Sequence, residues 1–218
     1  VTVTYREALA TGEVETHKAE ITVEVINYIS AFNITLNKTT YKYGEDLDYT
    51  AEITYADGTK EDATADTNIT TNYNNQQLGT QTVEFKYTET LDVIEEVNEL
   101  TVNAEVNVVD YITGVEITSP ITKTEYEVGE TLDLTGLEVT ANYASGATQV
   151  ITENVTVSGF DSSAEGTNQV TITYVENLAD FNETNTFTAT FDVTIVSSDI
   201  KVTGVTLDKT TDTINIGE

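Results

Sequence analysis

The stretch YEVGETLDLTGLEVTANYASG, from Tyr126 to Gly146, decides the fold of this chain. A shorter version of it, YKYGEDLDYTAEITYADG, runs from Tyr41 to Gly58. Both versions begin with a tyrosine shortly before a Gly-Glu pair and then alternate apolar with polar residues, which is typical of half-buried strands. The repetition indicates an array of similar modules and makes a unique catalytic motif an unattractive interpretation.

The remainder of the unit repeats as well. LGTQTVEFKY (Leu78–Tyr87) returns as EGTNQVTITY (Glu165–Tyr174), and the last tyrosine of each corresponds to Tyr5 in the opening VTVTY. Each of these segments precedes an expected alternating strand, at Ala19–Ile26, Leu100–Val109 and Phe187–Val196. The start of the unit recurs three times, at Phe32–Thr40, Gly114–Thr124 and Gly204–Thr211, and the third copy ends at Gly217 and Glu218.

These spacings predict the domain organisation. Residues 1–28 are expected to be the C-terminal part of a preceding module, and residues 29–110 and 112–198 two complete modules. Residues 199–218 are expected to be the N-terminal strand of a following module. The chain is then either a segment of a longer tandem array or a subunit whose partial modules are completed by neighbouring chains.

Each complete module has the pattern of an all-β fold. Seven or so short strands in fewer than 90 residues, separated by turn signals such as Asp57-Gly58 and Ser145-Gly146, predict an immunoglobulin-like β-sandwich. Gly44 and Gly129 are expected to supply positive φ at turns, and Gly136 a bulge or a close inter-sheet approach. After these turns the expected inward-facing side chains are Leu132 and Leu134 in the second module and Leu47 and Tyr49 in the first.

The order GVEIT, KTEYEVGETLDLTGLEVTANYASG, EGTNQVTITY and a closing alternating strand resembles the bacterial Ig-like modules of the Big family, especially group 3. The resemblance covers the second module nearly throughout. It covers the first with a deletion, because Thr50 to Gly58 spans eight residues where Thr135 to Gly146 spans eleven. It implies tandem β-sandwiches with an extracellular spacer, adhesion or stalk role, and it brings no catalytic site with it.

Composition narrows the possible functions. The chain has 218 residues, 38 Asp and Glu against nine Lys and Arg, and a net charge of −29. Such a surface repels phosphates and anionic lipid, so we expect neither nucleic acid partners nor membrane insertion. With no Cys and only His17, which is expected in an exposed loop, thiolate or His-cluster zinc sites are excluded and a Ser-His-Asp triad is implausible. We expect no enzyme activity and no catalytic, cofactor-binding or metal-ligating residues.

Acidic clusters leave one alternative open. Calcium takes six to eight oxygen ligands, and Asp110, Glu116 and Asp199 lie near the expected module junctions. A structural calcium ion there is possible, but the two junctions differ in sequence and no calcium-loop spacing is present. Solvated charge is the favoured interpretation for these residues and for the other clusters, which are Glu45, Asp46 and Asp48, and Glu95 and Glu96.

Lys38, Lys123 and Lys209 recur at matching places in a chain that is poor in lysine. An intramolecular isopeptide bond would need an Asn on the closing strand and a buried apolar pocket, and the closing strand FTATFDVTI has no Asn. We therefore expect these lysines to discourage association at sheet edges.

The favoured function is a non-catalytic spacer, stalk, adhesin shaft or filament outside a cell, at the cell surface or wall. Its expected partners are neighbouring Ig-like modules of the same or adjacent chains. One alternative is an adhesion module for a glycan or protein, although the chain lacks Trp and places Tyr87, Tyr143 and Tyr174 at expected core positions. The other alternative is a surface-layer or virion-appendage subunit. Five glycosylation sequons lie at Asn33, Asn37, Asn68, Asn154 and Asn182, and in a chain so rich in Thr we expect most of them to be chance occurrences.

Overall fold

The computed structural model describes residues 1–197 and Gly204. The chain divides into two compact units, Val1–Val109 and Asp110–Glu218. The expected third repeat, residues 199–218, lies outside the described residues apart from Gly204. The domain limits inferred from the repeats stay predictions.

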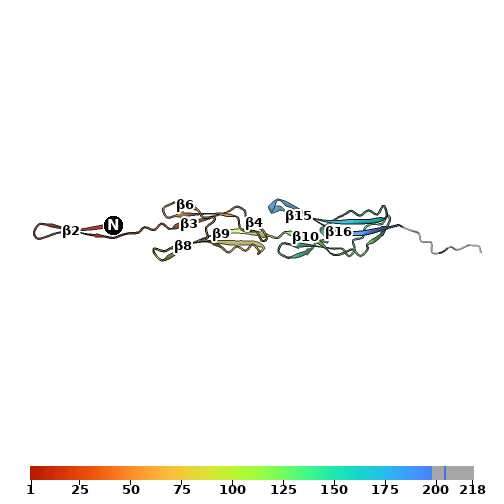
Figure 1. The fold of residues 1–218 in the computed structure, drawn as a ribbon, viewed down its shortest axis with the longest axis horizontal. Coiled ribbons are helices and arrows are strands. Elements are labelled where there is room, and N and C mark those ends of the chain that lie inside the picture. Colours follow the sequence, from red (N-terminus) through yellow and green to blue (C-terminus); the bar gives the residue numbers. More distant parts are fainter. Residues whose placement is uncertain (198–203, 205–218) are drawn as a thin grey trace, which may run out of the picture. The chain divides into compact units, whose positions relative to one another are not determined.

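The first unit begins with a two-stranded hairpin of β1 (Thr2–Ala8) and β2 (Val14–Glu20), drawn in red in Figure 1. Gly12, at φ +85°, closes its turn. Every residue of both strands is exposed, because no other strand of residues 1–197 covers either face.

The alternating segment Ala19–Ile26 is only partly a strand, so the prediction for it was wrong beyond Glu20. Ladder pairing ends at Glu20, and the amide of Ile21 bonds to the carbonyl of Val1 over 2.9 Å. An alternating pattern forms a strand only where a partner strand lies beside it, and no strand among residues 1–197 pairs with the positions after Glu20. Residues 21–28 therefore have no regular structure, and Val25 is 89% exposed.

Seven strands follow in the first unit and form the first module. They make one sheet of order β3-β5-β6 and another of order β4-β9-β8-β7 (Figure 1). The long antiparallel hairpin of β8 and β9 is paired from Gly79 with Val108 to Leu91 with Glu96. The strands are β3 (Ile29–Leu36), β4 (Thr40–Lys42), β5 (Tyr49–Tyr55), β6 (Lys60–Asp62), β7 (Ile69–Thr71), β8 (Gly79–Leu91) and β9 (Glu96–Val109).

The second module repeats this order strand for strand. Its sheets are β10-β12-β13 and β11-β16-β15-β14 (Figure 1). The strands are β10 (Ile112–Ser119), β11 (Glu125–Glu127), β12 (Glu138–Tyr143), β13 (Thr148–Val150), β14 (Thr156–Ser158), β15 (Gly166–Leu178) and β16 (Glu183–Val196). Two 3-10 turns, Thr152–Asn154 and Ala179–Phe181, are the helical segments among the described residues, and neither is long enough to cross a bilayer. The prediction of tandem, all-β, Ig-like sandwiches is confirmed.

Each module closes over its own apolar core. Alternate residues of β8 and β15 point inward, as the period of two predicts. In β8 these are Val83, Phe85 and Tyr87, exposed by 0%, 0% and 4%. The remaining core of the first module consists of Ile29, Phe32, Tyr41, Ala51, Ile53, Ala63 and Val106. The core of the second consists of Ile112, Ile121, Tyr126, Leu137, Val139, Ala141, Ile151, Val170, Ile172, Val193 and Ile195.

The segment that lengthens the second module is a turn. Gly136 has φ +90°, and the amide of Leu137 bonds to the carbonyl of Leu134 over 3.0 Å. The expected inward position of Leu134 was wrong, since it is 39% exposed and Leu137 enters the core instead. The prediction for Leu134 extended the alternation of apolar and polar residues through this segment, but the turn interrupts that alternation. Gly136 makes a close approach, because a Cβ there would lie 2.8 Å from Cγ2 of Thr122, but Thr122 belongs to the loop between β10 and β11, so the expectation of an approach between sheets was wrong.

Candidate functional site

The repeated phrase places a buried tyrosine beside a lysine and a glutamate, and we call Lys38, Tyr41 and Glu45 the Tyr41 cluster. Tyr41 is fully buried. Its hydroxyl donates to the carbonyl of Lys38 at 2.9 Å and contacts the backbone of Asp48, with the carbonyl at 3.2 Å and the amide at 3.3 Å. The Lys38 amine bonds to the Glu45 carboxylate and lies 4.9 Å from the centre of the Tyr41 ring.

The second module holds the same arrangement in Lys123, Tyr126 and Glu130, the Tyr126 cluster. The Tyr126 hydroxyl donates to the carbonyl of Lys123 at 2.9 Å and meets the Asp133 carbonyl at 3.1 Å and amide at 3.3 Å. The Lys123 amine donates to both carboxylate oxygens of Glu130 at 2.8 Å and lies 4.8 Å from the ring centre. The buried hydroxyl of each cluster therefore has partners from its own module.

The turn of the phrase closes through the same glutamates. Oε2 of Glu45 accepts the amide of Lys42 at 2.9 Å, and Oε2 of Glu130 accepts the amide of Glu127 at 2.7 Å. The intervening glycines, Gly44 and Gly129, have φ +82° and +88°, so the predicted positive φ is confirmed at both. An L-residue with a Cβ adopts that conformation only at a cost in free energy.

Electrostatics keep these clusters charged. Burial alone would raise the pKa of Glu45, but the hydrogen bonds from Lys38 and the Lys42 amide bring that pKa below its usual value. The hydrogen bond from Lys123, followed by the one from the Glu127 amide, lowers the pKa of Glu130. The hydrogen bond to Glu130 in turn raises the pKa of Lys123. An amine held protonated is a poor nucleophile, which argues against isopeptide chemistry at Lys123.

The expectation that the recurring lysines discourage sheet-edge association was wrong for the two that the structure describes. Lys38 and Lys123 lie in the loops before β4 and β11 and bind a glutamate of their own module. The physical reason is the turn, which returns the chain so that the glutamate seven residues later faces the lysine. Lys209 lies outside the described residues.

A second recurring group holds the start of each module, and sequence reasoning missed it. The amide of Ile29 donates to Oε2 of Glu89 at 2.9 Å, and the Asn98 side chain donates to the Ile29 carbonyl at 2.7 Å. In the second module the amide of Ile112 donates to Oε1 of Glu176 at 2.9 Å, and Glu176 is only 9% exposed. The available signal was a glutamate two residues after each repeated tyrosine, at Glu89 and Glu176.

The acids considered for calcium are engaged in local hydrogen bonds. Both oxygens of Asp110 accept from Ser145, the amide at 3.1 Å and the hydroxyl at 2.5 Å, so Asp110 caps the turn before β13. Glu116 accepts from the Asn142 side chain at 3.3 Å. Within residues 1–197 no three His, Cys, Asp or Glu are grouped to hold a metal ion, and Asp199 lies outside the described residues. The expectations of no metal, no cofactor and no catalytic residue stay predictions.

The other singled-out acids and the histidine are surface residues. Asp46 and Asp48 accept from the side chains of Asn75 and Asn37 at 3.3 Å and 2.6 Å. Glu95, at φ 56°, forms the tip of the β8–β9 hairpin. His17 is exposed as expected, but it lies on strand β2 opposite Tyr5 and not in a loop.

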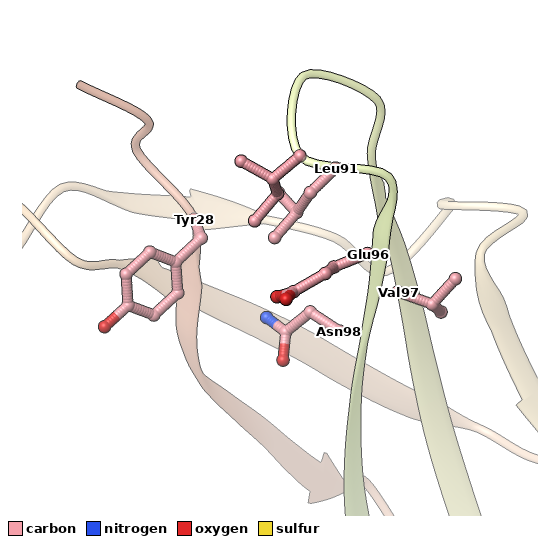
Figure 2. A pocket seen from close by; sticks show the side chains of 6 residues that line it. Tyr28, Leu91, Glu96, Val97 and Asn98 are labelled. Atoms are coloured by element: carbon pink, nitrogen blue, oxygen red, sulfur yellow. The ribbon is translucent and has the colours of Figure 1, made fainter. Parts of the chain in front are cut away.

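A hollow lined by both apolar and polar side chains lies beside the tip of the β8–β9 hairpin. It measures about 280 Å³ and is lined by Tyr28, Leu91, Ile94, Glu96, Val97 and Asn98. Figure 2 shows Tyr28 on one side, with Glu96 and Asn98 directed toward it from β9. Tyr28, Ile94 and Val97 are exposed by 47%, 46% and 60%. The corresponding tip of the second module differs, because Leu178, the counterpart of Leu91, is only 8% exposed.

Comparison with known proteins assigns the second module. Residues 119–195 match the bacterial Ig-like domain (group 3) over nearly the whole of strands β11 to β16. The resemblance noted in the repeated phrase is thereby confirmed for the second bacterial Ig-like module, and the first module shares its strand order.

Two further likenesses accompany this bacterial Ig-like domain. A stretch of 51 residues, 23% of this chain, is 51% identical to pectate lyase L of Thermoclostridium stercorarium. The matched region spans only 4% of that protein. Domains 4 and 5 of the S-layer protein SbsC are 17% identical over 77% of this chain and 98% of that structure, with a TM-score of 0.25. A TM-score of 0.25 is too low to carry an argument about fold or function.

Proposed function

We propose that this chain is a non-catalytic structural segment, a spacer made of Ig-like modules, in a bacterial surface protein. One observation carries the proposal: the polar side chains that recur in both modules form hydrogen bonds within their own module. The hydroxyls of Tyr41 and Tyr126 donate hydrogen bonds to backbone carbonyls of their own module. Glu45 and Glu130 each bind a lysine and a turn amide. Side chains repeated for function would be expected to present free polar groups to a ligand.

Charge and composition support a location outside the cell, at its surface or wall. A net charge of −29 keeps repeated modules apart and soluble through mutual repulsion. Stability without Cys does not depend on the redox state of the surroundings. Antibody labelling of intact cells that produce the protein tests this location, and labelling that requires lysis would contradict it.

Small-angle scattering tests the spacer role. A spacer is expected to stay monomeric, with a scattering profile that does not change with protein concentration. The alternative of a surface-layer or appendage subunit predicts assemblies that grow with concentration, as neighbouring chains supply strands to incomplete modules. Such growth would overturn the proposal of an isolated spacer.

Adhesion is a second candidate, and the hollow beside the β8–β9 hairpin tip favours it. Tyr28 and the neighbouring Ile94 and Val97 expose apolar surface beside polar groups of Glu96 and Asn98, a combination that suits one face of a sugar or an extended peptide. Glycan-array and matrix-protein binding that disappears in Tyr28→Ala but persists in Tyr5→Ala would support adhesion. Tyr5 is the matched control because it is 61% exposed on the separate β1–β2 hairpin.

Structural calcium at a module junction is tested by melting the protein with and without a chelator. The spacer as proposed needs no metal, so the melting temperature should not change. A fall in melting temperature that added calcium reverses would establish a metal site.

A further inference from the structure

The β8–β9 and β15–β16 hairpins end in loops of the same length. Residues 92–95 join β8 to β9, and residues 179–182 join β15 to β16. The last residue of each loop has a left-handed backbone, with φ 56° at Glu95 and 52° at Asn182. The tips of the two modules can therefore be compared residue by residue.

The two tips carry different side chains on this shared frame. Val93 and Val97 of the first module are 59% and 60% exposed. The second module has the polar residues Asp180 and Thr184 at the equivalent positions and still forms the same strand order. A side chain this exposed gains little free energy from burial, so folding does not account for the two valines. The first tip thus presents apolar surface that its fold does not need.

The apolar side chains of the first tip gather around the hollow beside Tyr28 (Figure 2). Tyr28 and Ile94 are about half exposed, Leu91 is half-buried, and Glu96 and Asn98 complete one wall. With about 280 Å³ the hollow is smaller than most small-molecule pockets, which measure roughly 300–1,000 Å³, so it suits one large side chain. Clustered exposed apolar side chains with a polar rim are typical of sites where another protein binds.

The rim of this tip is acidic. Five acidic residues and no Lys or Arg occur in Glu89–Glu99. Glu89 and Glu99 have partners within the module, the amide of Ile29 and the amine of Lys86. The exposed carboxylates that remain are Asp92, Glu95 and Glu96. A partner that brings positive charge to them gains association rate and specificity, whereas a second copy of this chain, with a net charge of −29, is repelled.

We propose that the tip of the β8–β9 hairpin docks an extended segment of a partner protein in which one large apolar side chain is flanked by Lys or Arg. The apolar side chain enters the hollow beside Tyr28, and the basic residues face Asp92, Glu95 and Glu96. The inference rests on the adhesion candidate and not on the spacer role, and it names the chemistry of the adhesion partner. A neutral sugar fits less well, because it would bring no cation to the three carboxylates.

Titration of the full chain, labelled with nitrogen-15, with capped pentapeptides tests this inference by nuclear magnetic resonance. Lys-Lys-Phe-Lys-Lys should shift the amide resonances of Tyr28 and Leu91–Asn98 and leave those of Leu178–Asn185 in place. Lys-Lys-Ser-Lys-Lys keeps only the charge, and Glu-Glu-Phe-Glu-Glu keeps only the apolar side chain. Each of these two control peptides should bind about tenfold more weakly or worse, since each loses one of the two interactions.

Two double variants separate the apolar and the acidic parts of the site. One is Val93→Asp with Val97→Thr, and the other is Asp92→Ala with Glu95→Asn. Each places at the first tip the residues that the second module carries at the same positions, so both variants should fold. Unchanged resonances of the buried Val83–Tyr87 would show that they do. Each variant should weaken binding of Lys-Lys-Phe-Lys-Lys about tenfold.

Several results would overturn the inference. They are equal shifts at both tips, no shift at the first tip, equal binding of the three peptides, and undiminished binding by both double variants. Shifts at the first tip that appear when the chain alone is concentrated would identify a second copy as the occupant and would also overturn it. Glycan-array binding that needs Tyr28, without peptide binding, would overturn the basic segment but leave adhesion standing. The spacer role is tested separately by scattering and labelling.

Discussion

At the scale of single residues, the repeated phrase combines turn formation with internal satisfaction of polar groups. Tyr126 fills the core with its ring, and its hydroxyl bonds to the backbone of Lys123 and Asp133, so this buried polar group has partners. Glu130 binds the lysine and the turn amide together. Each module needs these hydrogen bonds to fold, so the same residues recur in both modules. The repetition is therefore explained without a ligand.

Removing the hydroxyl in Tyr126→Phe should destabilise the second module by about 1–3 kcal/mol, because the Lys123 carbonyl and the Asp133 backbone lose a buried partner. Denaturant unfolding followed by tyrosine fluorescence measures the change. Tyr5→Phe is the control, since Tyr5 is 61% exposed and its change should stay within about 0.5 kcal/mol. Equal stability of Tyr126→Phe and wild type would contradict the role given to the hydroxyl.

The pKa of Glu130 makes a prediction about acid. Lys123 lowers that pKa below the unfolded value of about 4.3. Its stabilising contribution is therefore present above that pH and disappears as the pH falls through the lower, folded pKa. Glu130→Gln should unfold at lower denaturant concentration than wild type at pH 7, and the difference should close well below pH 4. The exposed Glu165 provides the control Glu165→Gln, and a gap that persists unchanged into acid would refute the assignment.

Tyr87 makes a prediction about alkali. Burial, followed by the 2.6 Å hydrogen bond to Asp66, raises its pKa to about 12. The stabilising contribution of protonated Tyr87 is thus fully present below the pKa of about 10 that tyrosine has in the unfolded chain, and it is lost as the pH rises toward 12. Wild type should lose stability across that interval, and Tyr87→Phe should lose less, as urea titrations of the first module at pH 9 and pH 11 would show. An equal loss in both proteins would mean that other groups control alkaline unfolding.

Sequence reasoning identified the positive-φ glycines but misassigned the lysines. The seven-residue spacing from Lys38 to Glu45 and from Lys123 to Glu130 was visible in both copies, yet only the turn geometry brings those pairs together. The pairing of Glu89 with Asn98 was harder to predict from the sequence. Asn98 meets it through the register of the β8–β9 hairpin, and that register depends on the loop between the strands.

At the scale of elements, alternation predicted strands well where a partner strand existed. Leu100–Val109 and Phe187–Val196 lie in β9 and β16, whereas only the first two residues of Ala19–Ile26 are paired, in the ladder of β1 and β2. The prediction that Leu134 faces inward was wrong for a related reason. Periodicity assumes a continuous strand, and the turn at Gly136 interrupts it.

Gly146 and Gly159 allow the cost of a positive φ to be measured apart from the cost of a steric clash. Gly146 and Gly159 have similar φ, +85° and +88°, but a Cβ at Gly146 would meet nothing whereas one at Gly159 would lie 2.5 Å from the carbonyl oxygen of Gln169. Gly146→Ala should cost only the backbone term, about 1–2 kcal/mol. Gly159→Ala should cost about 1–3 kcal/mol more, because β14 must move away from β15. Thermal unfolding of both variants measures the difference, and equal melting temperatures would argue against close packing at Gly159.

At the scale of the whole molecule, two seven-strand modules of one design follow a hairpin that no second layer covers within the part of the chain that the structure describes. Tyr5 matches Tyr87 and Tyr174 in the repeats, and that this hairpin is the end of a preceding module stays a prediction. Its Tyr5 and Val3 side chains occupy the face that is buried in β8 at Tyr87 and Phe85. The repeats made this organisation readable from sequence, but they contain no information about a ligand, because a spacer and an adhesin can share the same fold.

Amide hydrogen exchange should separate the hairpin from the modules. An isolated two-stranded hairpin is marginally stable, and every residue of β1 and β2 is exposed. The amides of Thr2–Ala8 should therefore exchange by orders of magnitude faster than those of Val83–Tyr87, although both lie in antiparallel ladders. The matched comparison is within one molecule, so solvent conditions are identical. Strong protection of the hairpin would mean that its apolar face is covered in solution. Loss of that protection on dilution would then identify a second chain as the cover, in favour of the assembling alternative over the isolated spacer.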